Sequence, residues 1–582
     1  MNTDLIIIPQ NFARIAPILT QYLTPLLHWF SRLVYEHLLA RQPNHLLCRL
    51  QRLLDFTELE AACATYHAAN SRGRPVSHSV SQLLRAMLVK YLYGLSLREL
   101  EEELQCHLLV KWFVGYPLLA ATPDHTTLHR FERYLCVHHP RLFFDTILRQ
   151  IDEAFPHDRQ RPQLGDTFAL QANAALESLI QRLRHVAQEL LRAYHTADPQ
   201  AYALLWSRLD HPALFGVAEE KAEGYLSTQA WHQRLRATVT ALLDCQHLLR
   251  QTALAPAVQG WLERLDKLLA DELRLELDEA GRLRHLTLLK KRGTYRLCSA
   301  TDPDATIRNH GRHKTDFAYN VSVLATVHFV RQIQVDTGSR PDGEAIADLL
   351  QAQQQHQGFC PDKLIYDQAA GWGKIVRQVD QVTAGQTQLV AYPVSAGRKS
   401  GADALTPEDF ALSADGLALT CPNSRVSRRK YAAGSAAGDN FRFTAAQCLG
   451  CPFLARCRGS ADPPTTHKAV FISAYRPEWN RLQTYSQTAA FKQDMKLRPQ
   501  VERIIAGLVL HNDARRARFR GQPKVSFQAH MCATAYNLKR WVALLAHKQR
   551  HQPPKKRRRF AAPQPAGGAV APTGGGVCLV LA

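Results

Sequence analysis

The fold is decided first by the stretch Asp166-Thr-Phe-Ala-Leu-Gln-Ala172, which alternates polar and apolar residues and predicts a strand that begins with an acid. A short apolar run, Lys363-Leu-Ile-Tyr-Asp367, predicts a buried strand that ends in a second acid. Two more strands are predicted between them, over residues 317–323 and 329–335. A helix that Asp342 can cap follows the third strand. The order strand, strand, strand, helix, strand predicts a mixed α/β sheet.

Two long segments interrupt this predicted sheet. Residues 174–294 are rich in Leu, Arg, Glu and Ala at helical spacing, which predicts a helical insertion. Residues 376–477 are broken by Gly, Pro and Ser and contain four cysteines, which predicts a small cysteine-rich insertion. A helical segment over about 478–505 and a final helix over roughly 526–547 then return the chain to the sheet.

The N-terminal residues 1–150 predict an all-α domain. Apolar side chains recur at helical spacing over 80–92, and Gly94 then ends that helix. A capping box at Ser96 opens a second helix, and a third helix begins near Asp124. This pattern fits a helix-turn-helix DNA-binding module and a plain helical bundle equally well.

The composition points to a polyanionic partner. The 582 residues include 72 Lys and Arg against 51 Asp and Glu, which gives a net charge of +21. Such an excess favours nucleic acid, although a basic protein that is only soluble is the alternative. No apolar run reaches the ~18 residues that can cross a membrane, so no membrane partner is expected. Thirteen cysteines without an export signal predict a reducing cytoplasm, where a cysteine cluster indicates a metal site before a disulfide.

Three separated acids, Asp166, Asp367 and Glu502, form the candidate active site. Two stand at the ends of predicted strands and the third lies in a predicted helix. Carboxylates that converge on one edge of a sheet can hold Mg²⁺. A pair of such ions stabilises both the attacking and the leaving oxygen of a phosphoryl displacement. The spacing alone leaves open the alternative that each acid is a helix cap or a surface charge.

Several stretches, in their order along the chain, resemble the DDE transposases of bacterial insertion sequences. The resemblance covers roughly residues 70–175 and 295–545, and it is closest to the branch with a cysteine cluster between the second and third acids. The stretches that carry it lie in the N-terminal helices and around the three acids: Gly73-Arg-Pro75, Lys90-Tyr-Leu-Tyr-Gly-Leu-Ser-Leu-Arg-Glu-Leu100, Pro123-Asp-His-Thr-Thr-Leu-His-Arg-Phe131, Gly165-Asp-Thr-Phe-Ala-Leu-Gln-Ala-Asn173, Thr301-Asp-Pro-Asp-Ala305, Lys314-Thr-Asp-Phe-Ala-Tyr-Asn320, Leu364-Ile-Tyr-Asp-Gln-Ala-Ala-Gly-Trp-Gly373, Arg498-Pro-Gln-Val-Glu502, Arg515-Arg-Ala-Arg-Phe-Arg-Gly521 and Tyr536-Asn-Leu-Lys-Arg540.

The resemblance implies a ribonuclease H-like catalytic domain built from residues 160–173, 295–375 and 478–547. It implies that the three acids bind two Mg²⁺ or Mn²⁺ ions, cut double-stranded DNA at the ends of the element and join its 3′ ends to target DNA. It further implies a homodimer or higher homo-oligomer on DNA, in the bacterial cytoplasm and associated with the nucleoid. The alternatives are a nuclease that hydrolyses DNA without joining it, and a catalytically inactive DNA-binding protein derived from a transposase.

This chain departs from the family pattern at two positions. Thr167 follows the first acid, where many relatives have Gly, and Val509 lies seven residues after Glu502, where relatives commonly have Lys. The basic residues that can replace this Lys are His511, Arg515 and Arg516. Arg498 and Glu502 are four residues apart and share a helix face. The pair fits a site role in which Arg498 is aimed at phosphate, and an exposed ion pair is the alternative.

Four cysteines of the second insertion have metal-ligand spacing. They form the pattern C-x26-C-x2-C-x5-C, made by Cys421, Cys448, Cys451 and Cys457. Four thiolates suit a tetrahedral structural Zn²⁺. Free buried thiols are the alternative, with an iron–sulfur cluster as a more remote one. Catalytic zinc is not expected, because four thiolates leave no open position.

Two groups of residues are candidates for DNA contacts. Polar side chains at the start of the third N-terminal helix are predicted to read bases, unless this domain serves dimerisation: His125, Thr126, Thr127, His129 and Arg130. A basic loop after Glu502 is predicted to hold phosphates, with a solvated loop as the alternative: Arg515, Arg516, Arg518, Arg520 and Lys524. Residues 548–582 predict a disordered basic tail that attracts DNA nonspecifically through Lys555-Lys-Arg-Arg-Arg559.

Overall fold

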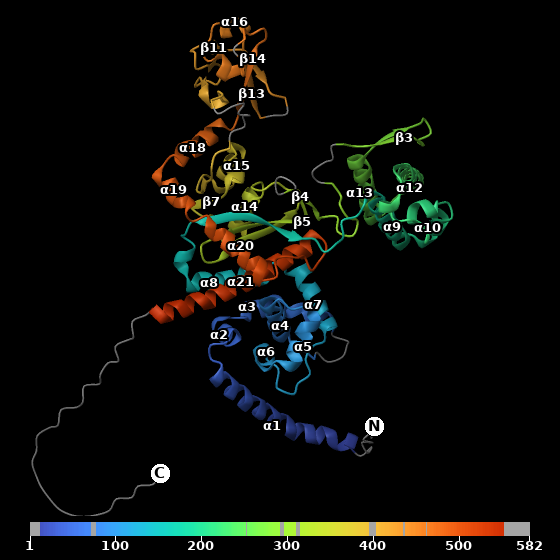
Figure 1. The fold of residues 1–582 in the computed structure, drawn as a ribbon. Coiled ribbons are helices and arrows are strands. Elements are labelled where there is room, and N and C mark those ends of the chain that lie inside the picture. The colour runs from blue at the N-terminus through green and yellow to red at the C-terminus, as the bar shows by residue number, and fades with distance from the viewer. Residues whose placement is uncertain are drawn as a thin grey trace, which may run out of the picture.

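Figure 1 shows the computed structural model of the chain, in which a central sheet lies between an N-terminal helical domain and two insertions. The structure describes residues 12–70, 77–251, 253–290, 296–309, 315–394, 403–434, 437–460 and 462–551. Most of the predicted basic tail, the stretch Gly73–Pro75 and Lys314 lie outside these residues.

Six strands form the central sheet. Their bounds are β1 Gln163–Gln171, β4 Thr306–Asn309, β5 Thr315–Ala325, β6 Val330–Thr337, β7 Lys363–Ile365 and β8 Gln388–Val390. The main path is β4-β5-β1-β7-β8, and β6 also pairs with β5. Strand β5 is antiparallel to β1, β4 and β6, whereas β7 is parallel to β1 and to β8. The predicted mixed sheet is therefore confirmed.

The register of β1 and β7 brings two of the predicted site acids together. Leu164 pairs with Ile365 in the parallel ladder. Asp166 and Asp367 each follow two residues later, so they lie beside one another at the same edge of the sheet. The prediction that the first strand begins with its acid is wrong by three residues, because β1 begins at Gln163. Asp166 is its fourth residue, and the apolar Leu164 before it is buried.

Helices cover both faces of the sheet. On one face, α14 Ile346–Gln357 and α15 Gly373–Thr383 pack around Leu324 and Tyr366. On the other, α21 Gln522–His551 packs against β6 and against α8 Leu142–Ala154, whose Asp152 accepts from Arg331 of β6. The helices that lead to α21 are α18 Arg476–Ser486, α19 Ala489–Met495 and α20 Pro499–His511. Alternate β5 residues such as Tyr319 and Val321 enter one core, as their shared face in the sequence predicts.

The N-terminal domain is helical, as predicted, and its caps are those expected. Its main helices are α4 Val80–Tyr93, α5 Leu97–Cys106, α6 Leu108–Val114 and α7 His125–His138. Gly94 ends α4 in the left-handed conformation, at φ 71°. Ser96 and Glu99 form a capping box at the start of α5, and Asp124 caps α7. The prediction of three helices misses α6, which lies between the second and the third. A longer helix, α1 Phe12–Arg41, precedes them and extends away from the sheet (Figure 1).

The first insertion is a separate helical unit with a core of its own (Figure 1). Its helices are α9 Leu179–Ala197, α10 Pro199–Trp206, α11 His211–Phe215, α12 Thr228–Leu249 and α13 Pro256–Glu272. The unit ends in an antiparallel hairpin, β2 Leu273–Leu277 and β3 Leu283–Leu288. A wholly helical reading of 174–294 is therefore wrong at its end. The Leu-x-Leu-x-Leu alternation over 273–277 is a strand signal, but it stands among strong helix formers.

The second insertion is a small β-rich unit. It contains the strand pair β13 Gly438–Phe443 and β14 Lys468–Ser473, and its core gathers residues such as Phe441 and Phe443. Short helices α16 Ala445–Cys448 and α17 Leu454–Arg458 carry cysteines. Since β8 belongs to the central sheet and α15 precedes it, the insertion begins after residue 390, later than the predicted 376. Within the residues that the structure describes, no helix has the length and apolar character needed to cross a membrane.

Candidate active site

The three candidate acids meet around one guanidinium. Arg498 Nη2 donates to Asp166 Oδ2 at 3.2 Å and lies 4.0 Å from Asp367 Oδ2. Arg498 Nη1 forms an ion pair with Glu502, one turn along α20. Asp166 comes from β1, Asp367 follows β7 and Glu502 lies in the first turn of α20. The fold thus brings together three segments that are far apart in the sequence.

Backbone amides hold the two aspartates in place. Asp166 Oδ1 accepts the N–H of Thr167 at 2.8 Å, and Asp367 Oδ1 accepts the N–H of Ala369 at 2.9 Å. In both residues the other oxygen, Oδ2, faces Arg498. The approach of the strands depends on Gly165, because a Cβ there would lie 2.4 Å from the ring of Tyr366.

Burial destabilises the ionised form of the two aspartates. The side chain of Asp166 is 16% exposed, that of Asp367 is 35% and that of Glu502 is 59%. Burial raises the pKa of Asp166 to about 6, with Asp367 adding to the rise and the Thr167 amide and Arg498 opposing it. Burial also raises the pKa of Asp367. Such a group of acids favours any nearby cation.

A fourth acid, Asp342, lies beside this group and was not predicted as a site residue. It accepts hydrogen bonds from Asn320 at 3.0 Å and from Arg308 at 3.2 Å. The same Arg308 nitrogen donates to Thr167 Oγ1 at 2.9 Å, next to Asp166. The expectation that Asp342 caps the following helix is wrong, because Ala345 is the N-cap residue of α14 and makes no side-chain cap.

The donor atoms suit a hard divalent cation, but a cation of the protein already lies among them. Carboxylate oxygens are the ligands that Mg²⁺ and Mn²⁺ prefer. Arg498 lies between these oxygens and neutralises part of their charge. In the described part of the chain, no three or more His, Cys, Asp or Glu side chains are grouped so as to hold a metal ion. The carboxylates of the three acids are thus paired with Arg498 in this structure.

The four cysteines gather in one place in the second insertion. All four are half-buried and border one small cavity, together with Phe443 and Leu454. Burial raises the pKa of the Cys457 thiol, and the other three cysteines raise it further. The four residues thus border one cavity, but within the described residues they are not grouped so as to hold a metal ion.

The predicted base-reading residues differ in their hydrogen bonds within the protein and in their exposure to solvent. His125 is tied to Glu101, whose carboxylate accepts from its Nδ1 at 2.7 Å and from its backbone N–H at 3.0 Å. Thr126 and Thr127 both donate to the capping Asp124. His129 and Arg130 are exposed on the next turn of α7. Thr126 is exposed as well, so three of the five candidates present their side chains to solvent.

Two arginines of the basic loop after α20 donate hydrogen bonds to backbone carbonyl groups of neighbouring segments. Arg518 donates to the carbonyl oxygens of Gly94, at 2.6 Å, and of Leu95, and it pairs with Asp513. Arg520 donates to the carbonyl of Asn173 at 2.8 Å. These two guanidinium groups brace the loop against the N-terminal domain and the end of β1. The side chains of the other three predicted phosphate contacts are exposed: Arg515, Arg516 and Lys524.

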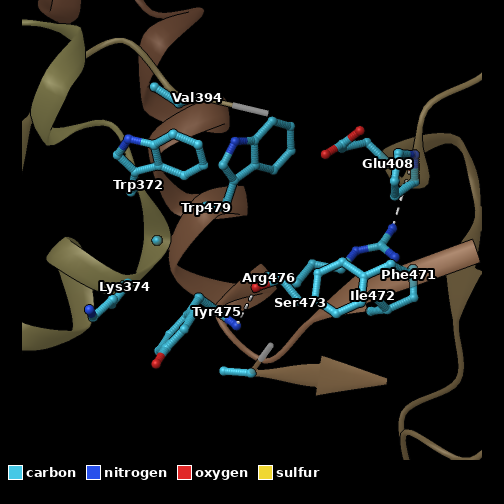
Figure 2. Close-up of a pocket in the computed structure, with 13 residues that line it drawn as sticks. Trp372, Lys374, Val394, Glu408, Phe471, Ile472, Ser473, Tyr475, Arg476 and Trp479 are labelled. Atoms are coloured by element: carbon cyan, nitrogen blue, oxygen red, sulfur yellow. Dashed lines mark hydrogen bonds between the residues drawn. The ribbon is translucent and has the colours of Figure 1, made fainter. Parts of the chain in front are cut away.

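An apolar cleft of about 380 Å³ lies between the start of α15 and residues 471–479, near the second insertion. Its walls include Trp372, Trp479 and Tyr475, and Lys374 and Arg476 bring positive charge to it. Figure 2 shows the two indole rings toward one side and Arg476 with Glu408 toward the other. The buried Nε1 of Trp479 and Nη1 of Arg476 make no hydrogen bond within the described residues. Sequence reasoning quoted Trp372 only as part of the second-acid stretch and missed this cleft.

Two protein-family models match the chain. One, described as a transposase domain (DUF772), matches residues 36–134, which include α4 to α6 and most of α7. The other, described as a transposase DDE domain, matches residues 420–542, which include the cysteine cluster and Glu502. Asp166 and Asp367 lie outside both matches. No curated protein and no solved structure matches the chain. The two matches, in this order along one chain, show that it is similar to DDE transposases at both ends of the chain.

Proposed function

We propose that the chain cleaves DNA at the ends of its insertion sequence and transfers the 3′ ends to target DNA by two-metal phosphoryl transfer. The observation that supports this most is the meeting of Asp166, Asp367 and Glu502 around Arg498. The strand order gives a second support, because an antiparallel β6-β5-β1 group followed by parallel β7 and β8 fits a ribonuclease H-like sheet.

In this proposal Asp166, Asp367 and Glu502 hold two Mg²⁺ or Mn²⁺ ions. Such ions, when bound, activate the attacking oxygen and stabilise the leaving oxygen of the phosphodiester. The contribution of the chain itself is positioning. The amides of Thr167 and Ala369 fix Oδ1 of the two aspartates, so that each Oδ2 faces the site. Glu502, which is more exposed, supplies the third carboxylate from the first turn of α20.

DNA would contact two exposed basic regions. His129 and Arg130 on α7 are proposed to read base edges at the element end. Arg515, Arg516 and Lys524 are proposed to hold phosphates. Arg518 and Arg520 then act by bracing the loop that carries these groups. A homo-oligomer on DNA and a cytoplasmic, nucleoid-associated location stay predictions.

The aromatic cleft is proposed to take an unstacked base of the DNA end. Its indole walls suit stacking, which contributes ~1–3 kcal/mol per base. The unpaired donors of Trp479 and Arg476 suit the acceptor atoms of a base edge. A fluorescent base analogue near the cleaved end should be quenched by the protein and should lose that quenching with Trp479→Leu. Trp261→Leu, in the first insertion, is the matched control, and equal loss with both variants would contradict the assignment.

The cysteine cluster is proposed to bind a structural Zn²⁺ through Cys421, Cys448, Cys451 and Cys457. The support is that all four border one cavity in a small unit with few apolar residues. A unit of this size gains much of its stability from a staple of this kind.

Metal-dependent strand transfer on a labelled element end separates the proposal from its alternatives. The transposase joins the labelled 3′ end to a target duplex in Mg²⁺ or Mn²⁺. A nuclease releases the end without joining it, and an inactive DNA-binding protein retards the DNA without cutting it. Inverted repeats in the DNA that flanks the gene supply the substrate.

A further inference from the structure

The candidate active site contains its own cation. Arg498 Nη2 lies 3.2 Å from Asp166 Oδ2 and 4.0 Å from Asp367 Oδ2, and Nη1 pairs with Glu502. Both aspartates accept a backbone N–H with Oδ1 and turn Oδ2 toward the guanidinium of Arg498. One guanidinium nitrogen therefore serves the two oxygens that a shared metal ion would need.

A metal ion and this guanidinium cannot use the two oxygens together. Mg²⁺ binds oxygen at ~2.1 Å, so an ion bridging both Oδ2 atoms needs the space that Nη2 holds. Two positive groups at that separation also repel strongly. One guanidinium does not neutralise three carboxylates, so the group still attracts a divalent ion.

Arg498 is held in a way that permits release. Its buried Nε has no hydrogen-bond partner within the described residues. The side chain is 22% exposed and stands at the N-cap of α20, where it can turn outward without unwinding the helix. A released guanidinium offers a planar pair of donors that matches a phosphate.

We propose that Arg498 is the internal counter-cation of the metal-free protein and that divalent metal displaces it from Asp166 and Asp367. The displaced side chain then becomes available to a DNA phosphate beside the metals. Metal binding and DNA binding are therefore coupled, and each strengthens the other. This inference rests on the proposed function, in which the three acids hold the metals.

The first test is a Mn²⁺ titration of the full-length protein without DNA, with free Mn²⁺ followed by electron paramagnetic resonance. Arg498→Gln removes the competing charge, so it should bind Mn²⁺ at least about fivefold more tightly than the unmutated protein. Arg498→Lys keeps the charge and should stay within about twofold. Arg503→Gln is the matched control, because Arg503 is exposed on the same helix and its side chain donates to Gln500. Equal or weaker Mn²⁺ binding by Arg498→Gln would overturn the proposal.

The second test uses the unmutated protein, so it does not depend on how a variant folds. Phenylglyoxal modifies accessible guanidinium groups, and mass spectrometry measures the rate at each arginine. Arg498 should react at least about fivefold faster in Mn²⁺ than in EDTA, while Arg503 reacts at the same rate in both. An unchanged or slower rate at Arg498 would contradict displacement.

Asp367→Asn separates failure of this inference from failure of the proposed function. If the unmutated protein binds no Mn²⁺, or if Asp367→Asn binds it equally well, then the three acids are not the metal site. If Mn²⁺ binding is present and is lost in Asp367→Asn, but Arg498 shows neither effect, only the displacement is wrong.

Discussion

The guanidinium of Arg498 lies 3.2 Å from Oδ2 of Asp166, although 332 residues separate the two in the chain. The contact joins the start of α20 to the central strand β1. Both insertions and the second acid lie between these residues in the sequence, so the hydrogen bond forms only when the two ends of the domain that holds the central sheet have come together. A site of this kind exists only in the folded chain.

Gly165→Ala should destabilise the central sheet. A Cβ at this position would lie 2.4 Å from the buried ring of Tyr366, so the ring or the strand must shift. Overpacking of this kind costs about 1–3 kcal/mol. The midpoint of thermal unfolding should fall, whereas Gly260→Ala in α13, where no atom stands near the new Cβ, should keep or raise it. Equal midpoints for the two variants would show that Gly165 is not needed for the strand approach.

Arg518→Gln should change the stability of the fold, whereas Arg515→Gln should change DNA binding. Arg518 binds two backbone carbonyls of the N-terminal domain, so its loss should lower the free energy of unfolding by about 1–2 kcal/mol. Arg515 is exposed, so its loss should leave stability unchanged. The slope of log DNA affinity against log salt should become shallower by about 1, the value for one phosphate contact. Paired measurements of unfolding and of affinity against salt check both expectations. If Arg518→Gln strongly reduces the salt dependence of DNA affinity, then Arg518 contacts a DNA phosphate.

Cys451→Ser should remove zinc and weaken the second insertion. Elemental analysis of the purified protein should find about one zinc per chain, bound by four thiolates. The variant should lose the metal and unfold at lower temperature, with little change in the chemistry of strand transfer. Cys360→Ser, a half-buried cysteine outside the cluster, is the control. Unmutated protein without zinc would remove the assignment.

His530 should make the fold sensitive to acid. Its Nε2 accepts from Arg141 at 2.9 Å, and its Nδ1–H donates to the carbonyl of Ser526 at 2.7 Å. Burial, helped by the charge of Arg141, lowers the pKa of His530 to about 3. In the unfolded chain the His530 imidazole binds a proton below pH ~6.5, whereas in the folded chain it binds one only below about pH 3. The free energy of unfolding therefore falls as the pH falls between these values.

The slope from this group is at most ~1.4 kcal/mol per pH unit. Unfolding midpoints at pH 7.5 and 5.5 should therefore converge in His530→Gln relative to the unmutated protein. His129→Gln, at an exposed position of α7, should keep the original pH dependence. If the midpoint of His530→Gln falls with acid as much as that of the unmutated protein, another group is responsible.

Local signals predicted much of the fold, because they depend on a few neighbouring residues. Gly94, Ser96 and Asp124 cap helices as their types dictate. The acids of two strands could be expected at one sheet edge once the strands were parallel. Asp166 and Asp367 are adjacent for this reason.

Contacts across the chain could not be predicted in the same way. Helical spacing places Arg498 beside Glu502, but only the fold brings it to Asp166. No spacing connects Asp342 with the site, because Arg308 and Asn320 reach it from other strands. The brace made by Arg518 likewise needs the N-terminal domain in place. Such residues carry ordinary sequence signals of surface charge and acquire their roles through packing.

We propose that Asp166, Asp367 and Glu502 act together as a metal-dependent site for DNA cleavage and joining. The most direct test of this proposal measures cleavage and strand transfer on a labelled element end, in Mg²⁺, for Asp367→Asn and for Asp362→Asn, an exposed aspartate just before β7. Asp367→Asn should reduce both reactions at least about 10³-fold and leave DNA affinity nearly intact, since metal ions supply several kcal/mol to the transition state. Asp362→Asn should behave as the unmutated protein. Full activity of Asp367→Asn would show that Asp367 takes no part in the reaction.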